Sequence, residues 1–203
     1  MITDDQDFQT IENLLVHNGI IEFYEIYNHA GLLELLNGND HLSTLLSSND
    51  IDNAGTKIGC INESEVNKVN DYVSTLGIDG KCKFAWSQDP DKSDFCLYAL
   101  RLTDAKGPII TGNDVESTIY EQDIIKIKLR SNAVEIFADA TKRNLDNVIA
   151  ILLDGKVISA PRVRSEISGG EIEISGRFSK SEAGYMAALL NNGVLPASFH
   201  VVR

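Results

Sequence analysis

The segment Ala150-Ile-Leu-Leu-Asp154-Gly155-Lys-Val-Ile-Ser159-Ala160-Pro161 decides the fold of this chain. The continuous apolar run from Val148 to Leu153 predicts a central strand buried on both faces. Asp154-Gly155 predicts a tight turn, because glycine accepts a positive φ and an aspartate side chain can hydrogen-bond the turn backbone. Lys156 to Ser159 would return as a second strand, and Pro161 would end it. The segment therefore predicts an antiparallel hairpin in the core.

Short strands and amphipathic helices are predicted on both sides of this hairpin. The strands are Ile20–Tyr27, Lys81–Trp86, Phe95–Leu102, Ile124–Leu129, Glu171–Ser175 and Ser198–Arg203. The helices are two short ones within Leu32–Leu46, then Asn62–Leu76, Ser131–Leu145 and one from Ser179 that ends at Gly193. Ser47 to Gly59 reads as a loop. These elements do not alternate as βαβ units, which favours an α+β fold with mixed or antiparallel sheets and helices on one face, of ferredoxin-like type.

Two of the helices allow sharper predictions. Asn62 and Glu65 are spaced as a capping box at the start of one helix. In the helix from Ser131, the apolar spacing predicts an inner face of Val134, Phe137, Ala138, Thr141 and Leu145. The side chains expected to be mostly buried in the core are Phe137, Ile151, Leu152, Leu189 and Leu190.

Composition and charge are those of a folded globular protein with an acidic N-terminal part. Of the 203 residues, 43% are hydrophobic and 24% charged, with a net charge of -12. Residues 1–60 hold ten acidic residues and one basic residue, a net charge of -9. Such a chain is a poor partner for nucleic acid. No apolar run approaches the ~20 residues needed to span a bilayer, so we expect either a cytosolic protein or a soluble piece of a larger one.

Three cysteines, Cys60, Cys82 and Cys96, leave the disulfide state open. The odd number argues against a complete disulfide framework, and buried free thiols are the favoured interpretation. One bridge with one free thiol is the alternative in an oxidising compartment. The histidines lack metal-binding spacing, so neither a metal nor another cofactor is expected.

An ordered series of motifs runs through the second half of the chain, and none of it forms an obvious catalytic set. The paired glycines fit either a hinge or an ordinary turn. The motif residues are Thr111, Gly112, Asp114, Asp154, Gly155, Ser159, Ala160, Pro161, Gly169, Gly170, Gly176, Glu182, Ala183, Gly193, Leu195 and Pro196. In order and spacing, the series resembles the extracytoplasmic part of SecD and of fused SecDF, the membrane-anchored accessory subunit of the Sec protein translocase. Asn18 to Tyr27 is similar to a strand of the family's base subdomain.

The resemblance implies a base built from both ends of the chain and a head between them. The N-terminal base strand and an acidic helical insertion would occupy residues 1–94, the head subdomain 95–176, and a returning base helix and strand 177–203. The implied domain lies on the periplasmic side of the inner membrane, binds unfolded preprotein and changes conformation to aid export. Its other partners would be the Sec translocon subunits. The family's proton-coupling residues lie in transmembrane helices that this sequence lacks, so none is carried over and the membrane would be reached only through those absent segments.

A second hypothesis is a stand-alone α+β ligand-binding domain or small enzyme that shares only the fold. It requires a pocket with convergent polar groups, for example Cys82, His29 and an acid. Whether the chain is an excised piece or a free-standing paralogue is left open.

Overall fold

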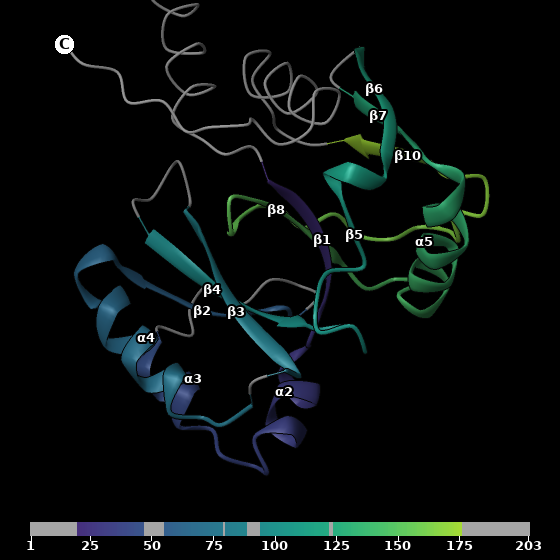
Figure 1. Cartoon of the computed structure of the whole chain (residues 1–203). Helices are drawn as coiled ribbons and strands as arrows, with labels where there is room; N and C mark the ends of the chain where they lie inside the picture. The colour runs from purple at the N-terminus through teal and green to yellow at the C-terminus, as the bar shows by residue number, and fades with distance from the viewer. Residues whose placement is uncertain (1–19, 47–54, 79, 89–93, 122–123, 176–203) are drawn as a thin grey trace, which may run out of the picture.

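The computed structural model describes residues 20–46, 55–78, 80–88, 94–121 and 124–175 (Figure 1). The described strands form two antiparallel sheets, and helices cover parts of both, which confirms the predicted α+β class. The expected helix from Ser179, the strand at 198–203 and the core residues Leu189 and Leu190 lie outside the described residues.

The larger sheet has seven strands: β1 (Ile21–Ile26), β2 (Lys57–Asn62), β3 (Cys82–Gln88), β4 (Asp94–Arg101), β5 (Ile110–Thr111), β8 (Ile149–Leu153) and β9 (Lys156–Ser159). The smaller sheet has the order β10 (Glu171–Ser175), β7 (Ile124–Leu129), β6 (Val115–Glu121). The α-helices are α2 (His29–Leu35), α3 (His41–Leu45), α4 (Val66–Ser74) and α5 (Ser131–Arg143). Two short 3₁₀ helices, η2 (Glu63–Glu65) and η3 (Gly112–Asp114), complete the described elements.

Strand β1 lies in the middle of the large sheet. One of its edges pairs with β8 from Ile21 to Glu25, and its other edge is shared by β5 and the end of β4. All five residues of β8 are buried, as the apolar run predicts. The alternation of side chains across the two strands sends Phe23 and Ile151 into one core and Tyr24 and Leu152 into another.

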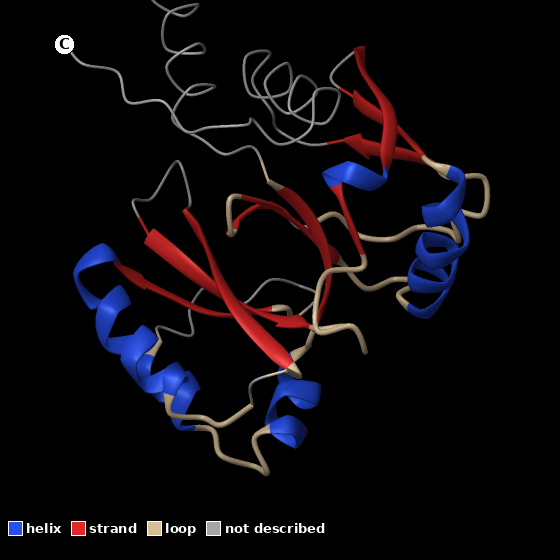
Figure 2. Ribbon diagram, in the orientation of Figure 1, coloured by secondary structure: helices blue, strands red, loops and turns tan. Residues whose placement is uncertain are grey.

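Three apolar cores surround this pair of strands. The first lies between the large sheet, the small sheet and α5. The second lies on the opposite face of β1 and β8, where the sheet curls until β3 and β9 approach within 8 Å between Cα atoms. The third lies under α2, α3 and α4, against β2, β3 and β4. Figure 2 shows these three helices at one end of the molecule and α5 beside the small sheet at the other.

Several predicted details are wrong. Strand β2 occupies residues assigned to a loop and to the start of a helix, and β6 was not expected. Asn62 makes no side-chain capping bond; it precedes η2, and α4 begins only at Val66. The buried face of α5 carries Ala133, Phe137, Ala140 and Thr141, whereas Leu145 follows the helix and is 46% exposed.

Pro161 does not end the pairing beside β8. Its carbonyl accepts a hydrogen bond from the Ile149 amide at 3.1 Å, and Arg162 forms a bridge with Val148. Proline lacks only the donor of the ladder, so a position whose N–H would face away from the partner strand tolerates it.

Cys60 and Cys96 form a disulfide, which corrects the favoured interpretation of three free thiols. The two residues lie directly opposite each other in the β2–β4 ladder. The bond spans 36 residues of sequence. In the chain-entropy model, a loop of that size corresponds to about 3–4 kcal/mol of stabilisation. Cys82 is a free buried thiol, and burial raises its pKa to about 12.

We expect Phe137→Ala to lower the free energy of unfolding by about 3–5 kcal/mol, because the ring is 3% exposed and packs edge-on against Phe23 at 5.9 Å between centroids. Urea unfolding followed by circular dichroism measures the change. Ile136→Ala is the matched control on the exposed side of the same helix, with an expected change within about 0.5 kcal/mol. Similar effects for both variants would contradict this assignment of the buried face.

Candidate functional site

A cavity of about 400 Å³ lies where the large sheet, the small sheet and α5 meet. Its floor is apolar and includes Phe23, Phe137, Ile149 and Ile151, which also belong to the first core. The segment 161–165, which follows β9, forms one side, and strand β10 forms the other. The site is therefore a gap between the edges of two sheets with a hydrophobic floor.

The cavity follows one edge of β10, called its open edge because no described strand pairs with it. The inward-facing Ile172 and Ile174 line it together with the outward-facing Glu171 and Glu173, so the cavity runs along the edge of the strand and not along one face. Among the described strands, β10 pairs only with β7. The Leu129 amide donates to the Gly170 carbonyl at 2.8 Å. Because hydrogen-bonded and non-bonded pairs alternate, the backbone groups of Glu171 and Glu173 point to the open edge.

The two sides of the cavity carry opposite charges. Arg162 and Arg164 come from the segment after β9, and Glu171 and Glu173 come from β10. The Arg162 guanidinium donates a hydrogen bond to the carbonyl of Asp146, which holds the end of this side chain in place. A chain lying between the two sides would meet apolar groups below and both signs of charge above, an environment suited to mixed side chains.

The segment that forms the arginine side is held against α5. The Ile167 amide donates to the Thr141 hydroxyl oxygen at 3.0 Å, and that hydroxyl donates to the Phe137 carbonyl at 2.9 Å. The cavity is thus bounded by backbone that hydrogen bonds keep in place on this side.

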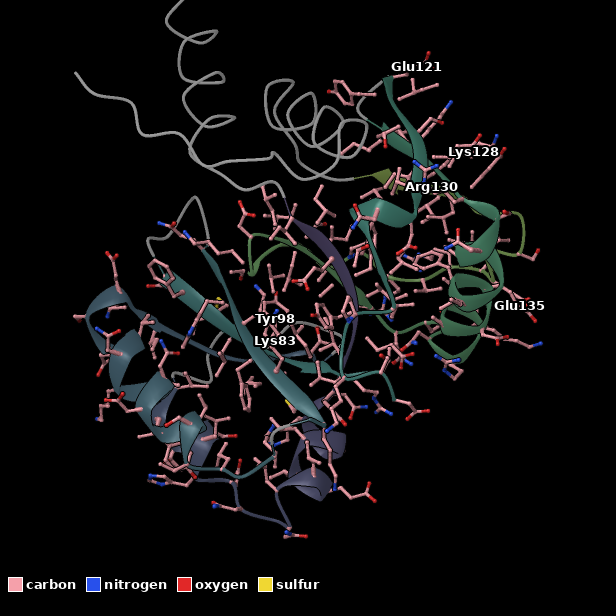
Figure 3. The ribbon with its side chains drawn as sticks, viewed as in Figure 1. Lys83, Tyr98, Glu121, Lys128, Arg130 and Glu135 are labelled. Atoms are coloured by element: carbon pink, nitrogen blue, oxygen red, sulfur yellow. A yellow bond between two sulfur atoms is a disulfide. The ribbon has the colours of Figure 1, made fainter. Side chains whose placement is uncertain are left out.

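The opposite face of the small sheet is charged and internally paired. Lys128 contacts Glu116 at 3.0 Å and Lys126 contacts Glu121 at 3.6 Å, and all four side chains are exposed. Figure 3 labels Glu121 and Lys128 on this sheet. Such exposed pairs add little stability, and they make this face mostly polar, although Ile119, opposite Lys126, is 54% exposed on it. Of the two faces of the sheet, the apolar one therefore turns towards α5 and the cavity.

Most of the predicted motif residues that the structure describes hold backbone in place. Asp114 accepts from the Thr111 amide at 2.9 Å, Thr111 accepts from the Asn113 amide at 3.3 Å, and the two form the capping box of η3. Gly112 lies in the same turn. The Asp114 carbonyl accepts from the Arg130 amide at 2.8 Å, which joins this turn to the start of α5. These residues set how the small sheet and α5 leave the large sheet.

The central turn also has a local role in the described structure. Asp154 and Gly155 have φ angles of 49° and 81°, as the turn requires. The Asp154 side chain accepts from the Ile20 amide at 2.9 Å and so ties the β8–β9 hairpin to the start of β1. Ser159 pairs with Ile151, and Ala160 packs on the second core. Among the predicted motif residues in the described ranges, Pro161 lines the cavity. Gly176, Glu182, Ala183, Gly193, Leu195 and Pro196 lie outside those ranges.

Two charged clusters on β1 escaped prediction from the sequence. The buried Glu25 accepts from the Arg143 guanidinium at 2.7 Å, which links the end of α5 to the large sheet. On the other face, Glu22 contacts Lys83 at 3.3 Å and accepts from the Tyr24 hydroxyl at 2.9 Å. Burial, with help from Glu22, raises the pKa of Tyr24, so its hydroxyl stays a donor. Lys83 and Tyr98 lie over the same part of this sheet (Figure 3).

The family match covers the residues that line the cavity, except Phe23. The family described as "SecDF, P1 head subdomain" matches residues 98–197, which include β5 to β10 and α5. The SecD of Acidaminococcus fermentans is 38% identical over 125 residues, which cover 57% of this chain and 30% of that protein. The chain belongs to the SecD/SecDF family.

Other relatives extend the match along the chain. SecD of Leptotrichia buccalis is 30% identical over 166 residues, and SecD of Desulfurispirillum indicum is 32% identical over 173. These matches cover 73% and 76% of this chain, but only 41% and 32% of the relatives. The fold is similar to a solved SecDF described as a membrane component that enhances protein export, with a TM-score of 0.51, 20% identity and coverage of 97% of this chain and 72% of that one.

The division into base and head remains a prediction. Strands β4 and β8, which fall inside the predicted head at 95–176, pair with β1 of the predicted base in the large sheet. Within the residues that match the SecDF P1 head, the small sheet and α5 are not part of the large sheet.

We expect Gly170→Ala to destabilise the protein by about 2–4 kcal/mol, because the residue has a φ of 71° and an added Cβ would lie 2.7 Å from Val134 Cγ2. Thermal unfolding measures the loss. Gly169→Ala is the neighbouring control, since its Cβ would meet nothing within 4 Å, and we expect a change within about 0.5 kcal/mol.

The double variant Gly170→Ala with Val134→Ala separates the two causes. Truncating Val134 removes the clash but leaves the left-handed backbone, so it should restore part of the loss. Equal stability of the Gly169 and Gly170 variants would show that this turn does not press against α5.

Proposed function

We propose that this chain is an extracytoplasmic domain of a SecD/SecDF-like protein-export accessory subunit, which binds translocating preprotein and changes conformation to aid export. The observation that carries the proposal is the match of residues 98–197 to the SecDF P1 head. The relatives' description as SecD subunits of the protein translocase supports it, as does a similar solved SecDF described as enhancing protein export. The proposed location is the periplasmic side of the inner membrane, and the proposed partners are unfolded preprotein and Sec translocon subunits.

The open edge of β10 is the proposed place of contact with preprotein. Strand addition uses backbone hydrogen bonds that every sequence can make, which suits a general client. The N–H and C=O groups of Glu171 and Glu173 would supply those bonds, and alternate client side chains would enter the cavity over Phe23 and Ile151. Binding should be weak, because the fixed costs of association fall on few contacts and the client must be released.

The described residues give little support to the alternative hypothesis that this chain is an enzyme. The cavity lining contains neither cysteine nor histidine. In the described ranges, no group of three or more metal-ligating side chains occurs. Cys82 lies in the third core and His29 is half-buried at the start of α2, and neither residue lines this cavity. The prediction of no catalysis stays a prediction. No helix in the described ranges has the length and apolar character needed to cross a membrane.

The test is titration of a labelled, unfolded peptide of about ten residues with alternating apolar and polar side chains against the full chain, followed by fluorescence anisotropy. We expect Glu173→Pro to weaken binding about 3- to 10-fold, because it removes one open-edge N–H. The substitution leaves the β7 ladder intact, since the Glu173 backbone points away from β7.

Glu173→Gln is the matched control, because it removes the charge but keeps the N–H; its affinity should stay close to that of the parent. Thermal unfolding of all three proteins shows whether the proline variant remains folded. Unchanged binding by folded Glu173→Pro would exclude strand addition at β10. Absence of binding by the parent chain up to millimolar peptide would instead exclude the preprotein-binding role itself.

A further inference from the structure

The Cys60–Cys96 disulfide lies inside the second core, where reagents cannot reach it in the native fold. The two residues are 4% and 2% exposed. They belong to the face of the large sheet opposite α2, α3 and α4. Exchange of a disulfide requires in-line approach of a thiolate to one of its sulfurs, so a bond this deeply buried forms or breaks only when the local structure is open.

The bond fastens the strand on which the helices pack. Among the described strands, β2 pairs only with β4. Ile58 and Ile61 of β2 reach into the third core and meet the apolar side chains of the helical layer. Strand β4 is itself held along its other edge by β3. Releasing β2 from β4 would therefore loosen the platform under the helices while leaving β3–β4 paired.

Cys82 is placed so that it does not compete for either partner in the folded state. Its side chain faces the third core, on the other side of the sheet from the disulfide. It is 7% exposed, and burial keeps the thiol protonated by raising its pKa to about 12. A protonated, buried thiol is a poor nucleophile for disulfide exchange.

We propose that a dithiol–disulfide oxidase makes the Cys60–Cys96 bond while β2 is still apart from β4, and that the bond then fastens β2 and the helical layer α2–α4 to the large sheet. The proposal rests on the extracytoplasmic location proposed above, where oxidising conditions prevail. It does not depend on preprotein binding.

The chemistry balances with a protein disulfide as oxidant. The thiolate of one cysteine attacks a sulfur of the oxidase disulfide, and the other oxidase sulfur leaves as a thiolate. The thiolate of the second cysteine then attacks the mixed disulfide at the first cysteine's Sγ and releases the remaining oxidase sulfur. Two thiols of the chain lose two electrons and two protons, and the oxidase disulfide becomes a dithiol.

The first test compares rates of thiol chemistry in the full chain. The reduced, urea-unfolded chain is diluted into a catalytic oxidase, quenched by alkylation and mapped by peptide mass spectrometry. We expect Cys60–Cys96 as the main product, with Cys82 alkylated. In the reverse direction, dithiothreitol should reduce the native bond at least about tenfold more slowly than the unfolded one. Equal reduction rates, or a main product that contains Cys82, would overturn the proposal.

The second test measures which elements lose amide protection when the disulfide is absent. Hydrogen exchange is compared for the parent, Cys60→Ser with Cys96→Ser, and the control Cys82→Ser. We expect the double variant to lose amide protection in β2 and α4 while β7 stays protected, since the core of the small sheet contains no cysteine in the described ranges. Retained protection in β2 and α4, or equal loss in β7, would contradict a local fastening role.

Discussion

The pairing of β1 with β8 is the interaction on which the rest of the structure depends. Both strands are buried on two faces, and five consecutive residue pairs join them. The face that carries Phe23 and Ile151 forms the floor on which α5 and the small sheet pack. The face that carries Tyr24 and Leu152 fills the curl of the large sheet. Strand β1 thus pairs with a strand more than a hundred residues later in the sequence. The cavity lies above that floor, between β10 and the segment after β9.

Local patterns were enough to predict the elements that such pairing needs. The apolar run in β8, the Asp154-Gly155 turn and the alternation in β7 and β10 each have a short-range physical cause, and each is present. Strand β2 could not be predicted in this way, because Lys57 to Asn62 contains a glycine, ends in a polar residue and becomes a strand only by pairing with β4. The inner face of α5 was assigned too far along the helix, because Leu145 looked apolar but falls beyond the last turn.

The candidate site was less predictable than the fold, since it is made of contacts between distant segments. Pro161 and Gly170 both belong to recognisable sequence motifs. No local pattern, however, predicts that Pro161 lines the cavity or that Gly170 packs against Val134. The partner of Cys60 likewise depends on the register of two strands. Glu25 is recognisable in the sequence as a charged residue inside a predicted strand. Its ion-pair partner, Arg143 at the end of α5, could not be identified from the sequence. That salt bridge joins the end of α5 to the large sheet.

The central claim is that the open edge of β10 accepts an extended polypeptide. It is tested most directly by amide hydrogen exchange of individual backbone positions, followed by NMR with and without saturating unfolded peptide. The account predicts slower exchange at Glu171 and Glu173, whose N–H groups point to the open edge, with little change at Ile172 and Ile174, whose groups face β7. Peptide that binds while the exchange of Glu171 and Glu173 stays the same would contradict it.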